Sequence, residues 1–215
     1  MDINLDFRGF SIVYDMINHK RLFEALEQVL KEVNSRTAEE FRVETVVEDR
    51  EDYELLCTSL NGLEEERLRQ QQTLWATQII RLQVLLEGHL KFLCKVTGTA
   101  RDLKLGLTDL NGSLVERGKL FLGDYADVIP KVHLVWSRIG LLHRLRNHLV
   151  HASVEKGAQN GAADVMKIVR ICQKFKLIED GNVVLTKEFC DYLHEGVKEL
   201  FELLFASMGW RTFRK

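Results

Sequence analysis

Residues 130–153 read PKVHLVWSRIGLLHRLRNHLVHAS, and their pattern predicts a helix. Pro130 suits the first turn, where its missing N–H would have no partner. At about 100° per residue, most apolar side chains fall in one arc: Val132, Leu134, Val135, Ile139, Leu141, Leu142, Leu145, Leu149 and Val150. Arg146 falls in the middle of this arc. A guanidinium in an apolar stripe is costly unless something pairs with it.

The composition is that of a helical globular chain. It has 215 residues, of which 46% are hydrophobic and 29% charged, and it contains a single proline. This length suffices for one core with a modest appendage, and the scarcity of proline predicts an all-α fold. The net charge of −2 provides no overall positive field, so binding of nucleic acid would depend on a local patch.

Cysteine usage and hydropathy point to a cytoplasmic protein without a membrane partner. The four cysteines lie far apart and form no C-x-x-C pair, so reduced thiols are expected: Cys57, Cys94, Cys172 and Cys190. No segment reaches about 18 uninterrupted apolar residues, and the N-terminus lacks a basic-then-apolar leader.

Helices are expected through the first hundred residues. Apolar residues at helical spacing from His19 onward predict one helix, which the polar residues 34–37 interrupt. The last of these, a threonine, forms a capping-box pattern with Glu40, so a second helix is expected to start there. A stripe of leucines predicts a long helix over residues 63–96, which the glycine-containing residues 97–99 should stop.

The second half continues this pattern. Ser113 is a candidate cap for a short helix, and Asp164 for another. Residues 177–185 have the alternation of a small β-hairpin that turns at Asp180-Gly181, and Thr186 begins the last amphipathic helix.

The expected domain organisation is a helical domain with an appendage. Residues 1–62 form an N-terminal helical extension of unknown role, and residues 63–215 form the main helical domain.

Common catalytic signatures are absent. The chain has no phosphate-binding P-loop, no dinucleotide-binding glycine pattern, no H-E-x-x-H and no G-x-S-x-G. His143, His148 and His151 lie close in sequence, but no cysteine or carboxylate on the same helix joins them. Zinc needs three or four convergent ligands, so no metal site is expected.

The run Arg146-Asn147-His148-Leu149-Val150-His151 resembles the signature of the HEPN superfamily. That signature is an arginine, then a polar residue, with a histidine four to six residues after the arginine. Its context also fits, because it lies near the end of a late helix in a helical domain, with another long helix before it. The resemblance covers roughly residues 65–210 and leaves residues 1–60 unexplained.

The resemblance implies an endoribonuclease of the toxin or antiviral-defence type, working as a homodimer without a metal or other cofactor. His151 would act as general base or acid on the ribose 2′-hydroxyl and the leaving oxygen, Arg146 would hold the scissile phosphate, and Asn147 would orient the phosphate or the histidine. Imidazole titrates near neutrality, and guanidinium offers forked donors to phosphate oxygens. DNA, which lacks the 2′-hydroxyl, should be spared.

Other residues are expected to support this site. His143 falls on the same helix face as Asn147, and Arg144 and His148 are candidates for contact with RNA. Glu87 on the preceding long helix is the candidate ion-pair partner of Arg146.

The spacing of the two main catalytic candidates constrains how they work. Residues five apart on a straight helix point about 140° from each other, so Arg146 and His151 do not share a face. The arginine of one subunit could meet the histidine of the other, with the apolar arc as the dimer interface. A helix that frays before His151 would also bring them together.

Two alternatives to an active nuclease remain open. One is a non-catalytic HEPN-like module for dimerisation or ligand binding, and the other is a helical scaffold unrelated to that superfamily. A cognate antitoxin or regulatory protein is a further expected partner. In toxins silenced by a nucleotidyltransferase, a tyrosine follows the histidine by two residues; this chain has Ser153 there, so the resemblance does not extend to that mode of silencing.

Overall fold

The computed structural model describes residues 7–44, 50–151, 178–179 and 182–210, and these residues are predominantly helical. The all-α prediction is confirmed for this part of the chain. The principal helices are α1 (Phe7–Glu44), α2 (Arg50–Ala100), α3 (Leu114–Leu120), α4 (Val135–His151) and α6 (Lys187–Ser207).

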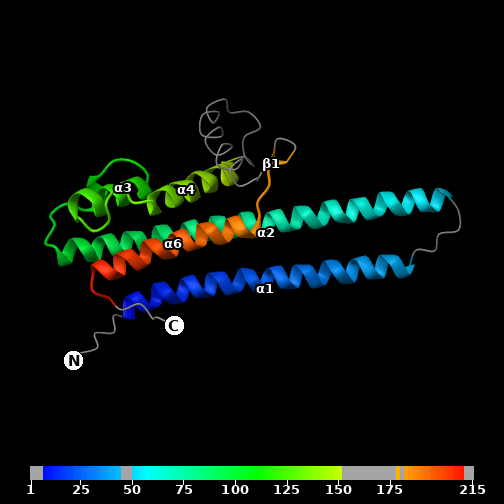
Figure 1. Ribbon diagram of the computed structural model, residues 1–215, viewed down its shortest axis with the longest axis horizontal. Coiled ribbons are helices and arrows are strands. Elements are labelled where there is room, and N and C mark those ends of the chain that lie inside the picture. The colour runs from blue at the N-terminus through cyan, green and yellow to red at the C-terminus, as the bar shows by residue number, and fades with distance from the viewer. Residues whose placement is uncertain (1–6, 45–49, 152–177, 180–181, 211–215) are drawn as a thin grey trace.

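A long antiparallel pair, α1 and α2, dominates the molecule (Figure 1). Helices α4 and α6 pack along the second half of α2, whereas the other ends of α1 and α2 project beyond them as a two-helix arm. Ile12 and Met16 on α1 are 1% and 5% exposed and belong to the core. The first part of α1 is therefore integral to the helical body. The expected boundary between residues 62 and 63 falls inside α2.

The expected break at residues 34–37 is wrong, because α1 runs through it. The hydroxyl of Ser35 donates to the carbonyl of Lys31 at 2.9 Å, and that of Thr37 donates to the carbonyl of Val33 at 3.1 Å. These hydroxyls bond back into the same helix, so neither ends one helix nor caps another.

The bounds of α2 also differ from the prediction at both ends. The helix begins at Arg50 instead of residue 63, and it continues past Gly98 to Ala100. The chain reverses at Asp102, whose φ is 51°, a conformation that aspartate tolerates better than most residues. Gly98 has a packing role, since a Cβ there would lie 3.2 Å from the ring of Phe121.

Short elements connect α2 to α4. A 3₁₀ turn, η1 (Leu107–Asp109), precedes α3, and a π-helical turn, η2 (Phe121–Tyr125), follows it. The Ser113 side chain accepts from the amide of Glu116, which confirms the predicted cap. Helix α4 starts at Val135, later than the predicted Pro130.

The core lies where α2, α4 and α6 meet. It is built from side chains that are 0% exposed, mostly leucines: Leu86, Leu90, Leu93, Leu122, Ala126, Val135, Ile139, Leu142, Leu145, Val197, Leu200 and Leu204. Thr186 caps α6 by accepting from the amide of Phe189, as predicted.

Two strands of two residues each precede α6. Strand β1 (Ile178–Glu179) pairs antiparallel with β2 (Asn182–Val183), and Ile178 lies opposite Val183. The expected turn at Asp180-Gly181, and the expected helix after Asp164, lie outside the described residues. Among the helices that the structure describes, none has an apolar stretch long enough to cross a membrane.

Candidate functional site

Helix α4 presents the Arg-Asn pair at the edge of the core. Leu142 and Leu145 are fully buried, whereas Arg146 and Asn147 are half-buried beside them. The apolar arc packs against α2 and α6 of the same chain, so the expectation that this arc forms a dimer interface is wrong. Val132 and Leu134, which precede α4, do not take part in this packing and are 90% and 80% exposed.

Arg146 retains unused hydrogen-bonding capacity. Its Nη1 donates to Oδ1 of Asn147 at 3.0 Å. Its Nε is buried and has no hydrogen-bond partner among the described residues. A buried donor without an acceptor is unfavourable, but an atom without solvent contact cannot meet a ligand where it stands, so an anion would have to bind the remaining N–H groups of Arg146.

A chain of polar side chains connects Arg146 to helix α2. Nδ2 of Asn147 lies 3.3 Å from Nε2 of His143, and Nδ1 of His143 lies 3.3 Å from Nε2 of Gln83. Nε2 of Gln83 also donates to Oε1 of Glu87 at 2.7 Å. Five residues on two helices therefore form one network that ends in a cation on α4 and a carboxylate on α2.

Donor and acceptor chemistry limits how His143 can bond in this network. Arg146 can only donate, so Oδ1 of Asn147 accepts and Nδ2 is left to donate to Nε2 of His143. A neutral imidazole that accepts at Nε2 carries its proton on Nδ1, which faces Gln83. Nε2 of Gln83, which donates to Glu87, is also the atom that faces Nδ1, so a neutral His143 can accept a hydrogen bond from only one of its two amide neighbours, Asn147 or Gln83.

The expected ion pair between Glu87 and Arg146 is wrong. The partner of Glu87 is Gln83, and the carboxylate reaches the guanidinium only through the intervening side chains. Gln83, which is 1% exposed, is the member that the sequence analysis missed. A glutamine inside the leucine-rich stripe of α2 was the available signal, because buried amides need partners.

The remaining predicted residues differ in how the structure places them. Arg144 is half-buried and folds back along α4, where its Nη1 lies 3.7 Å from a Cβ built on Gly140. His148 is half-buried. His151 is the last residue of α4, so the expected fraying before it does not occur, and its side chain lies outside the described ones.

Metal ligands and reactive thiols are the other candidate sites in the described part of the chain. Within the part of the chain that the structure describes, no three His, Cys, Asp or Glu side chains converge as metal ligands would. Cys57, Cys94 and Cys190 are free thiols, and burial raises the pKa of Cys94 and of Cys190 to about 12. The two buried thiols are therefore poor nucleophiles at neutral pH. Cys172 lies outside the described residues.

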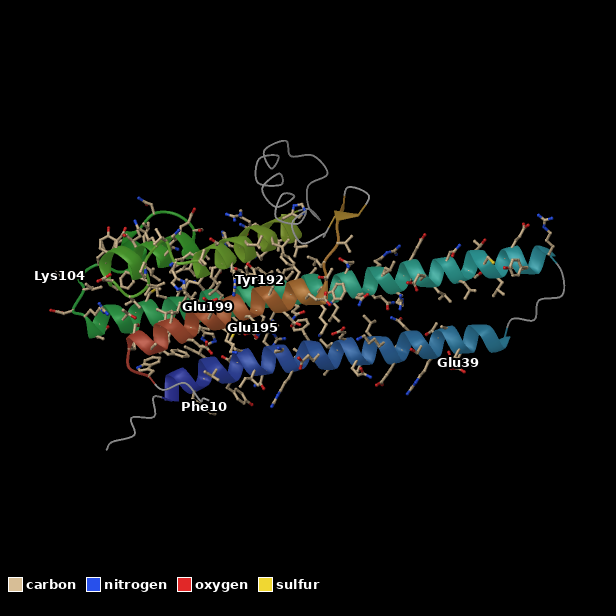
Figure 2. The ribbon with its side chains drawn as sticks, viewed as in Figure 1. Phe10, Glu39, Lys104, Tyr192, Glu195 and Glu199 are labelled. Atoms are coloured by element: carbon tan, nitrogen blue, oxygen red, sulfur yellow. The ribbon has the colours of Figure 1, made fainter. Side chains whose placement is uncertain are left out.

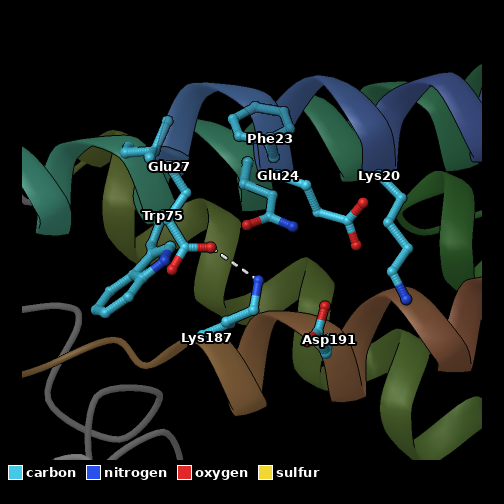
Figure 3. A pocket seen from close by; sticks show the side chains of 9 residues that line it. Lys20, Phe23, Glu24, Glu27, Trp75, Lys187 and Asp191 are labelled. Carbon is cyan, nitrogen blue, oxygen red and sulfur yellow. Dashed lines mark hydrogen bonds and ion pairs between the residues drawn. The ribbon is translucent and has the colours of Figure 1, made fainter. Parts of the chain in front are cut away.

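A small pocket lies between α1, α2 and α6 (Figure 3). Its volume is about 10 Å³, room for about one water molecule. Across it, Nζ of Lys187 donates to Oε2 of Glu27 at 2.8 Å, which joins α6 to α1. This pocket is an inter-helix contact and too small for a substrate.

Comparison of the chain with family models, with curated proteins and with solved structures found no match.

Proposed function

We propose that the protein is a metal-independent endoribonuclease that acts on RNA at the Arg146–His151 signature, as the HEPN resemblance implies. The observation that carries this proposal is the half-buried guanidinium of Arg146, which Asn147 holds at the edge of the core and which has no carboxylate partner among the described residues. A phosphate oxygen would accept charge-assisted hydrogen bonds from the N–H groups of this guanidinium.

The proposed chemistry is attack by the ribose 2′-hydroxyl on the adjacent phosphate. His151 takes the proton from the 2′-hydroxyl or returns one to the leaving 5′-oxygen, and Arg146 stabilises the charge that develops on the phosphate. The products are a 2′,3′-cyclic phosphate and a 5′-hydroxyl. Asn147 orients Arg146, and the contacts from His143 through Gln83 to Glu87 support that orientation.

A homodimer completes the site in this proposal. Since α4 is helical through His151, the backbone positions of Arg146 and His151 in one chain lie about 140° apart around the helix axis. The arginine of one subunit then works with the histidine of its partner. Arg144 and His148, on the same segment, are proposed to contact the RNA backbone. A cytoplasmic setting and regulation by a cognate antitoxin or other protein belong to the same proposal.

The test is cleavage of single-stranded RNA in the presence of EDTA. Wild type should cut, and Arg146→Ala and His151→Ala should each lose at least about 100-fold in rate. Arg36→Ala, an exposed arginine on α1, is the matched control and should retain full activity. Equal activity in all four proteins, or no cleavage by wild type, would overturn the assignment.

One observation favours the alternative of a non-catalytic docking module. Val132 and Leu134 lie two positions apart in the chain before α4 and are almost fully exposed, as surfaces that bind partners often are. If docking is the whole function, Leu134→Glu should abolish self-association in sedimentation while RNA stays intact with every variant. Cleavage of RNA by wild type would exclude this alternative.

A further inference from the structure

A broad trough lies at the end of α2 away from the two-helix arm. It has a volume of about 830 Å³ and lies between the last turns of α2, the segment that follows it, and α3. Lys104, on one wall, marks this end of the molecule, and Glu39 marks the arm at the opposite end (Figure 2). The volume falls in the range that holds small-molecule ligands.

The floor of this trough is aliphatic. Its apolar lining is dominated by leucines: Leu103, Leu105, Leu107 and Leu114. Phe121 also belongs to the lining, but only 1% of it is exposed, so it offers no ring face on which a base could stack. The floor therefore suits an alkyl chain better than a nucleobase.

The rim of the trough is positively charged. Four cations line it, Lys91, Lys95, Lys104 and Arg117, against one carboxylate, Asp102. Among the described residues, no acid lies within ion-pair distance of these four cations.

Arg117 places a fixed positive charge on the wall of the trough. Its Nη1 donates to the carbonyl of Leu107 at 3.2 Å, and its Nε is buried without a hydrogen-bond partner among the described residues. The contact with Leu107 holds the guanidinium against the trough wall. Nε itself has no solvent contact, so Arg117 would act on a carboxylate in the trough through its positive charge and its other N–H groups.

We propose that this trough binds a fatty acid, with the alkyl chain along the leucine floor and the carboxylate at the basic rim. Charge complementarity and the aliphatic floor together select this ligand class, because neither a cationic amphiphile nor a short carboxylate uses both features. The trough lies apart from the Arg146 network, so this inference does not depend on ribonuclease activity.

Calorimetric titration of the full chain tests the proposal. Dodecanoate below its micelle concentration should bind once per chain. Butyrate, which has the head group without the long tail, and dodecyltrimethylammonium, which has the tail with the opposite charge, should each bind at least tenfold more weakly. Equal binding of the cationic detergent would overturn the proposal, since it would mean non-selective adsorption.

Two variants locate the site. Lys104→Glu, an exposed change on the rim, should weaken dodecanoate binding at least tenfold, whereas Arg36→Glu, the same charge change on α1, should leave it unchanged. Leu105→Gln on the floor should also weaken it, with the circular dichroism spectrum retained. No dodecanoate binding, equal loss in Lys104→Glu and Arg36→Glu, or binding of a uridine oligonucleotide in place of dodecanoate would each overturn the proposal.

Discussion

Nδ1 of His143 on α4 lies 3.3 Å from the side-chain amide nitrogen of Gln83 on α2, although the two residues are 60 positions apart. This contact joins the helix that carries the signature to the long helix of the body. It places a buried amide between an imidazole and the Glu87 carboxylate. The orientation of Asn147, and through it of Arg146, therefore depends on a residue outside the signature.

Gln83→Leu should impair the site without unfolding the protein. The leucine keeps the volume but removes both hydrogen bonds, so His143 loses its fixed orientation. We expect the rate of RNA cleavage to fall about tenfold with little change in KM. Losses of this size are typical when a residue that orients a site residue, without touching the ligand, is removed. Gln70→Leu, at an exposed position of the same helix, is the control and should leave the rate of RNA cleavage unchanged.

The ¹⁵N shifts of His143 provide a second readout. In wild type two amide donors, from Asn147 and Gln83, compete for the one acceptor nitrogen of a neutral imidazole, whereas Gln83→Leu leaves only Asn147 and should shift the tautomer toward the proton on Nδ1. Identical spectra for wild type and Gln83→Leu would contradict the contact between His143 and Gln83.

Stability should fall as the pH drops from about 6.5 toward 4. His19 and His194 are buried, their ring centroids are 5.7 Å apart, and they bond to the carbonyls of Gln78 and Met16. Burial, followed by repulsion from His194, lowers the pKa of His19 from 6.5 to about 4, and burial also lowers the pKa of His194. The unfolded chain thus binds more protons in this window, and the folded state loses up to about 3 kcal/mol through His19.

Urea denaturation at pH 7 and pH 5 measures this effect. His19→Gln should reduce the difference in the free energy of unfolding between the two pH values. An unfolding free energy for wild type that is the same at both pH values would show that these histidines are not buried in their neutral form.

Lys187→Met should destabilise the protein modestly. Burial of Glu27 favours its neutral form, but hydrogen bonds from Lys187 and Lys31 outweigh it and lower the pKa of Glu27. Stability from this carboxylate is present above its unfolded pKa, near 4.5, and is lost as the pH falls through the folded value. We expect a loss of about 1 kcal/mol at pH 7, because Lys187 is partly exposed.

Two controls apply to Lys187→Met: the pH dependence of its loss of stability, and a variant that breaks an exposed ion pair. The loss should shrink as the pH falls below about 4.5 and Glu27 takes up a proton. Arg50→Met, which breaks the highly exposed pair with Glu54, should cost less than about 0.5 kcal/mol. If Arg50→Met lowered the free energy of unfolding more than Lys187→Met, the partly buried pair would not be the more stabilising one, which would contradict this prediction.

Gly118→Ala should loosen the packing of α3 on α2. A Cβ at Gly118 would lie 2.7 Å from Cδ2 of Leu90, and Leu90 is 0% exposed and cannot move away freely. Overpacking of this kind costs about 1–3 kcal/mol. Thermal unfolding should show a clear loss for Gly118→Ala and almost none for Gly62→Ala, where a Cβ meets nothing within 4 Å. Equal effects would mean that α3 does not pack as closely as this contact indicates.

The helical content and two helix starts could be predicted from the sequence because they rest on local chemistry. Ser113 and Thr186 each cap a helix through a bond to an amide three residues on, and a pattern of neighbours is enough to predict such a bond. The predicted break at residues 34–37 also rested on local capping chemistry, but there the prediction was wrong. Hydroxyls that cap a helix can equally bond to the carbonyl four residues back.

The set of residues that forms the candidate site was harder to predict from the sequence. Arg146 and Asn147 were found from their own helix, and the structure brings them together with the predicted His143. Gln83 was missed because its role exists only when α2 packs against α4. The direct pairing of Glu87 with Arg146 was wrong because no local pattern reveals that another side chain stands between them.

The most direct measurement of the proposed chemistry is the mass of the ends left on a defined single-stranded RNA after incubation with the protein in EDTA. Catalysis by Arg146 and His151 predicts fragments ending in 2′,3′-cyclic phosphate and beginning with 5′-hydroxyl, formed by wild type and lost in His151→Ala. Fragments ending in 3′-hydroxyl, cleavage that persists in His151→Ala, or RNA that remains intact with wild type would contradict it.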